Sequence, residues 1–159
     1  MSAEVGSVRR PLLVIAVLAG SWTHAAAARV SPDPPQPPKR PTLAHRVVAF
    51  AERQVGVPYS YGGISRQTGF DCSGLVYAAY RSIGRMIPHS SWAQMDLGKR
   101  VGFGRLRPGD LLFTEGGGHV MLVVSKRSAV EAPHTGARVS YVRLSSVRGR
   151  FAVARRLLR

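Results

Sequence analysis

Cysteine and acidic residues are scarce in this sequence of 159 residues. Cys72 is the only cysteine, so no disulfide forms within the chain, and a domain of this size buries enough surface to fold without one. Asp and Glu number 8 against 23 Lys and Arg, which gives a formal net charge of +15. That field attracts polyanions such as nucleic acid, anionic lipid or acidic wall polymers, but charge alone does not identify the partner.

The sequence also lacks an apolar run long enough to cross a bilayer. Its most apolar segment is PLLVIAVLAG at 11–20, whereas a spanning helix needs about 20 residues. Arg9 and Arg10 precede this segment and small residues at A-x-A spacing follow it, which is the order of a secretory signal. We therefore expect 1–28 to be a signal peptide, with an uncleaved N-terminal anchor as the alternative. No cysteine near the expected cleavage site offers a point for lipid attachment.

Prolines crowd the next segment, SPDPPQPPKRP at 31–41. Proline fixes φ and lacks a backbone N–H, so this stretch favours an extended polyproline conformation over a packed element. We expect 29–41 to be a linker and 42–159 to form one domain. That domain holds 18 Lys and Arg and 6 Asp and Glu, so its own net charge is 18 − 6 = +12.

Helical patterns come first in the domain, and strand patterns follow. Thr42 is positioned to cap a first helix that ends at Gly56, and Asp71 to cap a second that runs to about Ser82. A short helical segment is expected at 90–95. Five strand-like segments with short connections then favour antiparallel pairing: 110–114, 119–125, 128–133, 137–143 and 151–157. The expected fold class is α+β, with N-terminal helices packed on an antiparallel sheet of about five or six strands.

Cys72 is the first residue of the second expected helix, immediately after its cap. Backbone N–H groups without intrahelical acceptors and the positive end of the helix dipole surround that position, and both stabilise a thiolate. An isolated cysteine is more often a small buried hydrophobic residue. A catalytic interpretation therefore depends on a histidine base and on a third group that orients the base.

Two histidines can supply these partners. His119 begins the most apolar expected strand, and His134 lies just beyond the end of the next one. Antiparallel pairing brings the start of one strand beside the end of its neighbour, so we expect the two histidines to be close together. Cys72 and two histidines are also possible zinc ligands, but their spacing is poor for a metal site.

Six motifs in order carry a resemblance to a known family: GVPYSYGG, GFDCSGLV, IPHSSWAQ, LRPGDLLF, GHVMLVV and EAPHTGARV. Over about residues 43–157 the domain resembles the NlpC/P60 family of cell-wall cysteine peptidases, which have a papain-like α+β core. The resemblance implies that Cys72 is the nucleophile, His119 the general base and His134 the orienting residue, with no metal or other cofactor. It also implies an oxyanion- or substrate-binding role for three residues: Tyr59, Asp71 and Ser73.

Two positions depart from the family pattern. Met121 stands where the family usually has a glycine, and strand alternation puts it on the same sheet face as His119, where the alternatives are a crowded cleft or an altered fit of the substrate. Thr114 stands where an aromatic residue is common.

The resemblance implies an exported cysteine hydrolase that cleaves amide bonds in peptidoglycan stem peptides, specifically a γ-D-glutamyl–diamino acid endopeptidase. The alternatives are an amidase or acyltransferase on a papain-like core, a noncatalytic wall-binding protein and a secreted nucleic-acid binder. The expected partners are peptidoglycan and, through the basic surface, anionic envelope polymers. Nucleic-acid binding and stable membrane insertion are not expected. We expect a monomer in the periplasm, at the cell wall or outside the cell.

Overall fold

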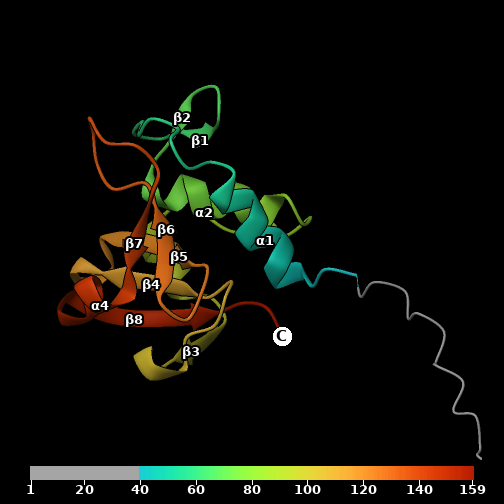
Figure 1. Ribbon diagram of the computed structural model, residues 1–159, viewed down its shortest axis with the longest axis vertical. Coiled ribbons are helices and arrows are strands. Elements are labelled where there is room, and N and C mark those ends of the chain that lie inside the picture. Colours follow the sequence, from blue (N-terminus) through green and yellow to red (C-terminus); the bar gives the residue numbers. More distant parts are fainter. Residues whose placement is uncertain (1–39) are drawn as a thin grey trace, which may run out of the picture. The chain divides into compact units, whose positions relative to one another are not determined.

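The computed structural model describes residues 40–159 (Figure 1). The expected signal peptide at 1–28 and all but the last two residues of the expected linker lie outside the described residues, so both stay predictions. The helices are α1 (Leu43–Glu52), α2 (Cys72–Arg81), α3 (Ser91–Met95) and α4 (Leu144–Val147), with short 3₁₀ segments η1 (Phe103–Arg105), η2 (Glu115–Gly117) and η3 (Arg148–Arg150). None of the helices in this part of the chain is long and apolar enough to cross a membrane.

Six strands form one antiparallel sheet in the order β3-β8-β4-β5-β6-β7. This arrangement confirms the expected α+β class and strand number. Five of the six strands fall within the segments predicted from the pattern, but β3 was not predicted, because its sequence KRV has no apolar alternation and it pairs at the sheet edge. The sheet strands are β3 (Lys99–Val101), β4 (Leu111–Thr114), β5 (His119–Val123), β6 (Ser128–Glu131), β7 (Ser140–Arg143) and β8 (Phe151–Arg156), and a separate hairpin is made of β1 (Ile64–Ser65) and β2 (Gly69–Phe70).

The two long helices begin at the predicted caps. The Oγ1 of Thr42 accepts a hydrogen bond from the N–H of His45, and the Asp71 carboxylate accepts one from the N–H of Gly74. Helix α1 ends at Glu52, earlier than the predicted end at Gly56, because the chain turns through tighter i→i+3 bonds after Ala51.

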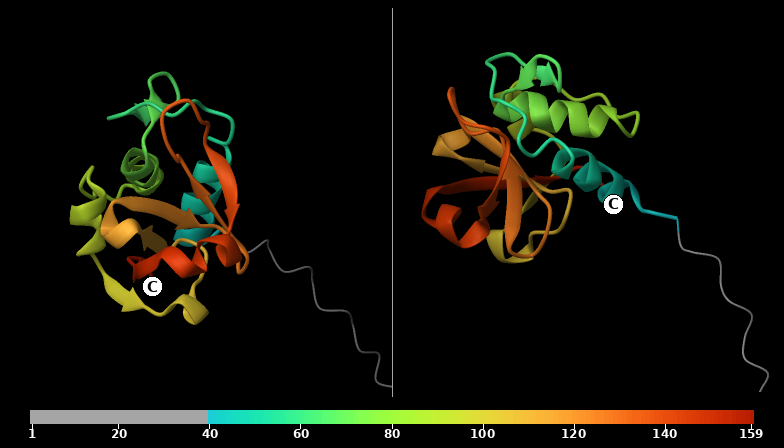
Figure 2. Two further views of the ribbon diagram at one scale, coloured as in Figure 1. Left: turned by 90° about the vertical axis from the view of Figure 1, so that its left-hand side faces the viewer. Right: turned by 45° about the horizontal axis from the view of Figure 1, so that its top comes forward.

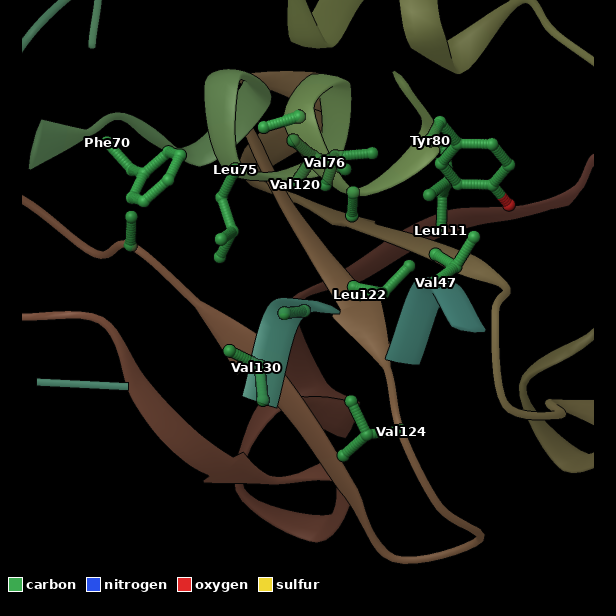
Figure 3. Close-up of a cluster of buried hydrophobic side chains, with 14 of the residues drawn as sticks. Val47, Phe70, Leu75, Val76, Tyr80, Leu111, Val120, Leu122, Val124 and Val130 are labelled. Atoms are coloured by element: carbon green, nitrogen blue, oxygen red, sulfur yellow. The ribbon is translucent and has the colours of Figure 1, made fainter. Parts of the chain in front are cut away.

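Helices α1 and α2 lie together on one side of the sheet (Figures 1 and 2). Apolar residues from α1, α2, β4, β5 and β6 fill the space between them (Figure 3). Tyr80 closes one end of this core, where its hydroxyl donates to the carbonyl oxygen of Gly109 over 2.7 Å. The labelled members of the cluster include Val47, Leu75, Val76, Leu111, Val120, Leu122 and Val130. Burial of α2 against β5 fixes the start of the helix relative to the start of that strand.

The opposite sheet face carries a second, smaller core under α4. Its buried members alternate along the strands with those of the first core, as strand geometry requires. They are Leu112, Met121, Val123, Ala129, Leu144 and Val147. Both faces of the central strands are therefore buried.

Candidate active site

Cys72 is the first residue of α2, and its side chain is partly exposed. The backbone of Asp71 is extended before the helix begins, so the cysteine sits where the first N–H groups of α2 have no intrahelical acceptor. The predicted position of Cys72 at a helix N-terminus is confirmed, so its side chain lies beside the positive end of the helix dipole.

The buried carboxylate of Asp71 holds together the segments around Cys72. Its Oδ1 accepts from the N–H of Gly74 over 2.6 Å and from the Ser73 hydroxyl over 3.1 Å, while Oδ2 accepts from the N–H of Gly62 over 2.8 Å. The Nε2 of His89 lies 3.0 and 3.1 Å from the two carboxylate oxygens. One side chain thus fixes the helix start, the loop before it and the segment before α3.

Gly74 makes this close arrangement possible. A Cβ at this position would lie 2.0 Å from the carbonyl oxygen of Gly63 and 3.0 Å from both Asp71 Oδ1 and His89 Nε2. Any larger residue would displace the loop that packs against the start of α2.

His119, the first residue of β5, lies between Cys72 and the carboxylate of Glu131. Its Nε2–H donates to Oε2 of Glu131 over 2.7 Å, and the side chain of Cys72 lies close enough to the ring to raise its pKa. Because Nε2 donates its hydrogen bond to Glu131, Nδ1 is the ring nitrogen that is available to interact with the thiol of Cys72. The side chains of His119 and Glu131 are only 12% and 16% exposed.

The pKa of His119 is raised from its ordinary value of 6.5 to about 9. Burial alone lowers this pKa, but the hydrogen bonds and the negative charges of Cys72 and Glu131 raise it by more. The imidazole is therefore held as imidazolium at neutral pH, which is the form that pairs with a thiolate.

Glu131, and not His134, occupies the position beside His119. Strand β6 ends at Glu131, and the pairing of Leu122 with Val130 places Glu131 diagonally across from His119 on the same sheet face. His134 lies beyond the strand end, exposed, with Nδ1 2.9 Å from the carbonyl oxygen of Thr135. The predicted strand at 128–133 was too long, and this error brought His134 to a position that the register gives to Glu131.

A groove of about 550 Å³ opens at Cys72. The three residues expected to bind substrate or oxyanion all line it: Tyr59, Asp71 and Ser73. Burial raises the pKa of Tyr59, and the nearby charges of Cys72 and Asp71 raise it further, so the phenol stays protonated beside Cys72. The aromatic side chains of Tyr61 and Trp92, 91% and 57% exposed, also line the groove.

Residues 56–156 match the model of the NlpC/P60 family. The chain belongs to this family. RipA of Mycobacterium tuberculosis, named a peptidoglycan endopeptidase, is 35% identical over 58% of this chain and 23% of its own length. A γ-DL-glutamyl hydrolase of Bacillus subtilis is 37% identical over 58% of this chain and 21% of its own length. The chain thus spans less than a quarter of the length of these two relatives.

Solved structures of NlpC/P60 proteins share the fold. A family protein from Bacillus cereus superposes with a TM-score of 0.69 and 31% identity, over 75% of this chain and 41% of its own. Structures of RipA variants mutated at a cysteine, at a histidine and at a glutamate superpose with TM-scores of 0.64 to 0.65 over 73% of this chain and 62% of theirs. The core of this NlpC/P60 domain is therefore papain-like and α+β, as expected.

In this NlpC/P60 domain Met121 replaces the glycine that is usual in the family, and this replacement does not narrow the groove. Met121 shares a sheet face with His119, as predicted, but its side chain is 1% exposed and packs in the second core. It is not among the residues that line the groove, so of the two alternatives crowding of the cleft does not occur. Thr114, the other departure, lies opposite His119 in the β4–β5 register and is fully buried.

His89 and Glu131 are the site residues that the sequence interpretation missed. His89 lies in the motif IPHSSWAQ, and its ring stacks on Tyr77 with ring centroids 5.9 Å apart. Strand alternation offered a signal for Glu131, since it follows the buried Ala129 by two residues, on the same face. No three His, Cys, Asp or Glu side chains gather into a possible metal site among residues 40–159.

Proposed function

We propose that this protein is a cysteine endopeptidase that cleaves amide bonds in peptidoglycan stem peptides. The observation that carries the proposal is the chain of contacts from Cys72 at a capped helix start, through His119, to Glu131. These are the groups that thiol-based acyl transfer requires: a nucleophile, a base and a group that orients the base. A groove gives substrate access to the thiol.

In the proposed mechanism the Cys72 thiolate attacks the scissile carbonyl carbon, and the developing oxyanion accepts hydrogen bonds from donors at the start of α2 and from Tyr59. As the C–N bond breaks, His119 gives its Nδ1 proton to the leaving amine. Water then attacks the thioester, His119 takes a proton from that water, and the acid product leaves with the thiolate restored. Glu131 keeps the ring oriented and stabilises its charge throughout.

The RipA variants support the assignment of Glu131. In RipA the mutated glutamate follows the mutated histidine by 444 − 432 = 12 positions, the separation that also lies between His119 and Glu131. His134 fits less well, because it contacts neither Cys72 nor His119 in any hydrogen bond within residues 40–159. We therefore propose the triad Cys72, His119 and Glu131.

The proposed bond is the one between γ-D-glutamate and the diamino acid of the stem peptide. The names of two relatives support this choice, since one is a peptidoglycan endopeptidase and the other a γ-DL-glutamyl hydrolase. An amidase or acyltransferase would use the same triad, whereas a noncatalytic wall-binding protein has no need of a histidine held as imidazolium next to a thiol.

Digestion of purified peptidoglycan tests the proposal. The full chain is compared with Cys72→Ala, and the released fragments are identified by mass spectrometry. We expect fragments cut after γ-D-glutamate from the unmodified protein, and a loss of at least about 10³-fold in rate from the variant. Equal release by the variant, or no release by either protein, would refute a cysteine peptidase, and cleavage between sugar and peptide would indicate an amidase.

We also propose that the protein is exported, because its first 28 residues have the charge and apolar pattern of a signal peptide. Cell fractionation and the N-terminal sequence of the mature protein test this. Recovery of the intact chain with the cytoplasmic fraction would contradict it.

A further inference from the structure

A hollow of about 930 Å³ lies apart from the groove at Cys72. It opens beside α4, on the sheet face that carries the second core, and shares no residue with the groove. Its apolar floor includes Phe103, Leu106 and Leu144. Four basic side chains surround that floor, and together they define the basic hollow: Lys126, Arg127, Arg143 and Arg148.

Backbone pairing brings these basic residues together from separate parts of the chain. Ser128 pairs with Arg143 in the β6–β7 register, so the turn that carries Lys126 and Arg127 lies beside the end of β7. The N–H of Leu144 then donates to the carbonyl oxygen of Arg127 over 2.9 Å. Backbone hydrogen bonding therefore fixes Arg127 and Arg143 beside each other at the edge of the hollow.

The charges of the basic hollow are uncompensated. No Asp or Glu lines it, and within residues 40–159 the arginines in salt bridges are Arg150 and Arg156, which lie outside the hollow. Clustered like charges repel one another, so an anion bound among them relieves that repulsion. Guanidinium groups also match phosphate oxygens in a bidentate geometry.

The floor restricts the kind of anion. Within residues 40–159, Phe103 is the one aromatic residue among those that line the hollow. The guanidinium of Arg148 lies 5.4 Å from the centre of the Phe103 ring. Nucleic-acid bases stack on open aromatic faces, and this hollow does not offer a row of them. A flat bilayer surface does not enter a concave site. The geometry therefore favours phosphate groups joined by small units whose carbon atoms pack on an apolar floor.

We propose that the basic hollow binds a phosphodiester-linked polyol or sugar polymer of the cell envelope. The phosphates pair with Arg143, Arg148 and the Lys126–Arg127 turn, while the carbon side of each unit contacts Phe103 and Leu144. That the polymer belongs to the envelope rests on the proposed function, but the binding chemistry does not. The site would hold the enzyme on its substrate while the groove at Cys72 stays free.

Titration with a purified glycerol-phosphate polymer tests the proposal. The full chain carries Cys72→Ala so that hydrolysis plays no part, and salt is near 0.15 M because weak surface attraction is screened there. The test protein is a double variant in which Arg143 and Arg148 are both replaced by Gln. The control is a double variant in which Arg46 and Arg81 are replaced by Gln, which removes the same charge from exposed positions on α1 and α2. We expect a loss of affinity of roughly tenfold for the first pair and less than about twofold for the second.

Ser145→Glu provides an independent test, because it puts a carboxylate into the hollow without removing a basic residue. We expect it to weaken polymer binding as the arginine pair does, with thermal unfolding unchanged. Equal losses for the two arginine pairs would overturn the proposal, since binding would then follow net charge alone. Tighter binding of a polygalacturonate, a single-stranded oligonucleotide or phosphatidylglycerol vesicles would also overturn it. Binding that persists while peptidoglycan is not cleaved would refute the proposed function and leave this site standing.

Discussion

The Nε2–H of His119 donates to the Glu131 carboxylate over 2.7 Å, and the ring lies near enough to Cys72 for that side chain to raise its pKa as well. Both members of this pair lie near the ends of adjacent strands, where the sheet meets the start of α2. The sheet register therefore sets the orientation of the imidazole, and the capped helix sets the position of the thiol.

Comparing substitutions of Glu131 and His134 tests which of the two residues orients His119. We expect Glu131→Ala to lower kcat/KM by about 10²- to 10⁴-fold, because the imidazole loses both its orientation and its stabilising charge. His134→Ala should stay within about twofold, since that side chain is exposed and bonds only to Thr135. Hydrolysis of a labelled stem peptide measures both, and the reverse ranking of the two variants would contradict the triad proposed here.

The pH profile should report the raised pKa of His119. That pKa is about 9, so His119 is protonated below pH 9 and can give a proton to the leaving amine. The value of kcat/KM should therefore fall as the pH rises through 9. Glu131→Gln keeps an acceptor but removes the charge, which lowers the pKa of His119. We expect the alkaline limb of the residual activity to move down by about 1 pH unit. An unmoved limb would mean that another group titrates there.

The same pKa predicts a change in stability. Because the folded-state pKa of His119 lies above its unfolded value, the stabilisation is full below about pH 6.5 and is lost as pH rises through 9. The free energy of unfolding of wild type and His119→Gln, measured by urea denaturation, should therefore converge between pH 6.5 and 9.5. A constant difference across that range would contradict the pairing of His119 with its two partners.

Removing the N-cap of α2, Asp71, should cost more stability than removing the N-cap of α1, Thr42. Asp71→Ala leaves four donors without their acceptor in a buried setting, and we expect a loss of about 3 kcal/mol in the free energy of unfolding. Thr42→Ala, the matched cap at an exposed helix start, should cost about 0.5–1 kcal/mol. Chemical denaturation measures both, and equal costs would show that Asp71 acts only as a cap.

Gly74→Ala should disturb the site through the backbone. Its new Cβ would lie 2.0 Å from the carbonyl oxygen of Gly63, so the loop or the helix must move, at a cost of about 2–3 kcal/mol with a large loss of activity. Gly149→Ala is the control, because nothing lies within 4 Å of a Cβ there. It should change stability by less than about 0.5 kcal/mol. Similar melting temperatures for the two variants would contradict this close packing.

Local sequence rules determined the position of Cys72 at a helix start and the fold class. An N-cap bonds to N–H groups within its own first turn, so Asp71 and Cys72 place a thiol at a helix start whatever surrounds them. Likewise the change from a helical to an alternating pattern predicts helices followed by an antiparallel sheet. These features depend on residues only a few positions apart, and the pattern of one segment is enough to show them.

Tertiary structure decided which groups meet that thiol. The choice of Glu131 over His134 follows from where β6 ends and from its register against β5, and the predicted strand end at 133 differs from the observed end by two residues. The contact of His89 with Asp71 and the gathering of basic side chains around Phe103 join segments far apart in the chain. Such contacts follow from the packing of helices and strands against one another, which no single segment of the sequence specifies.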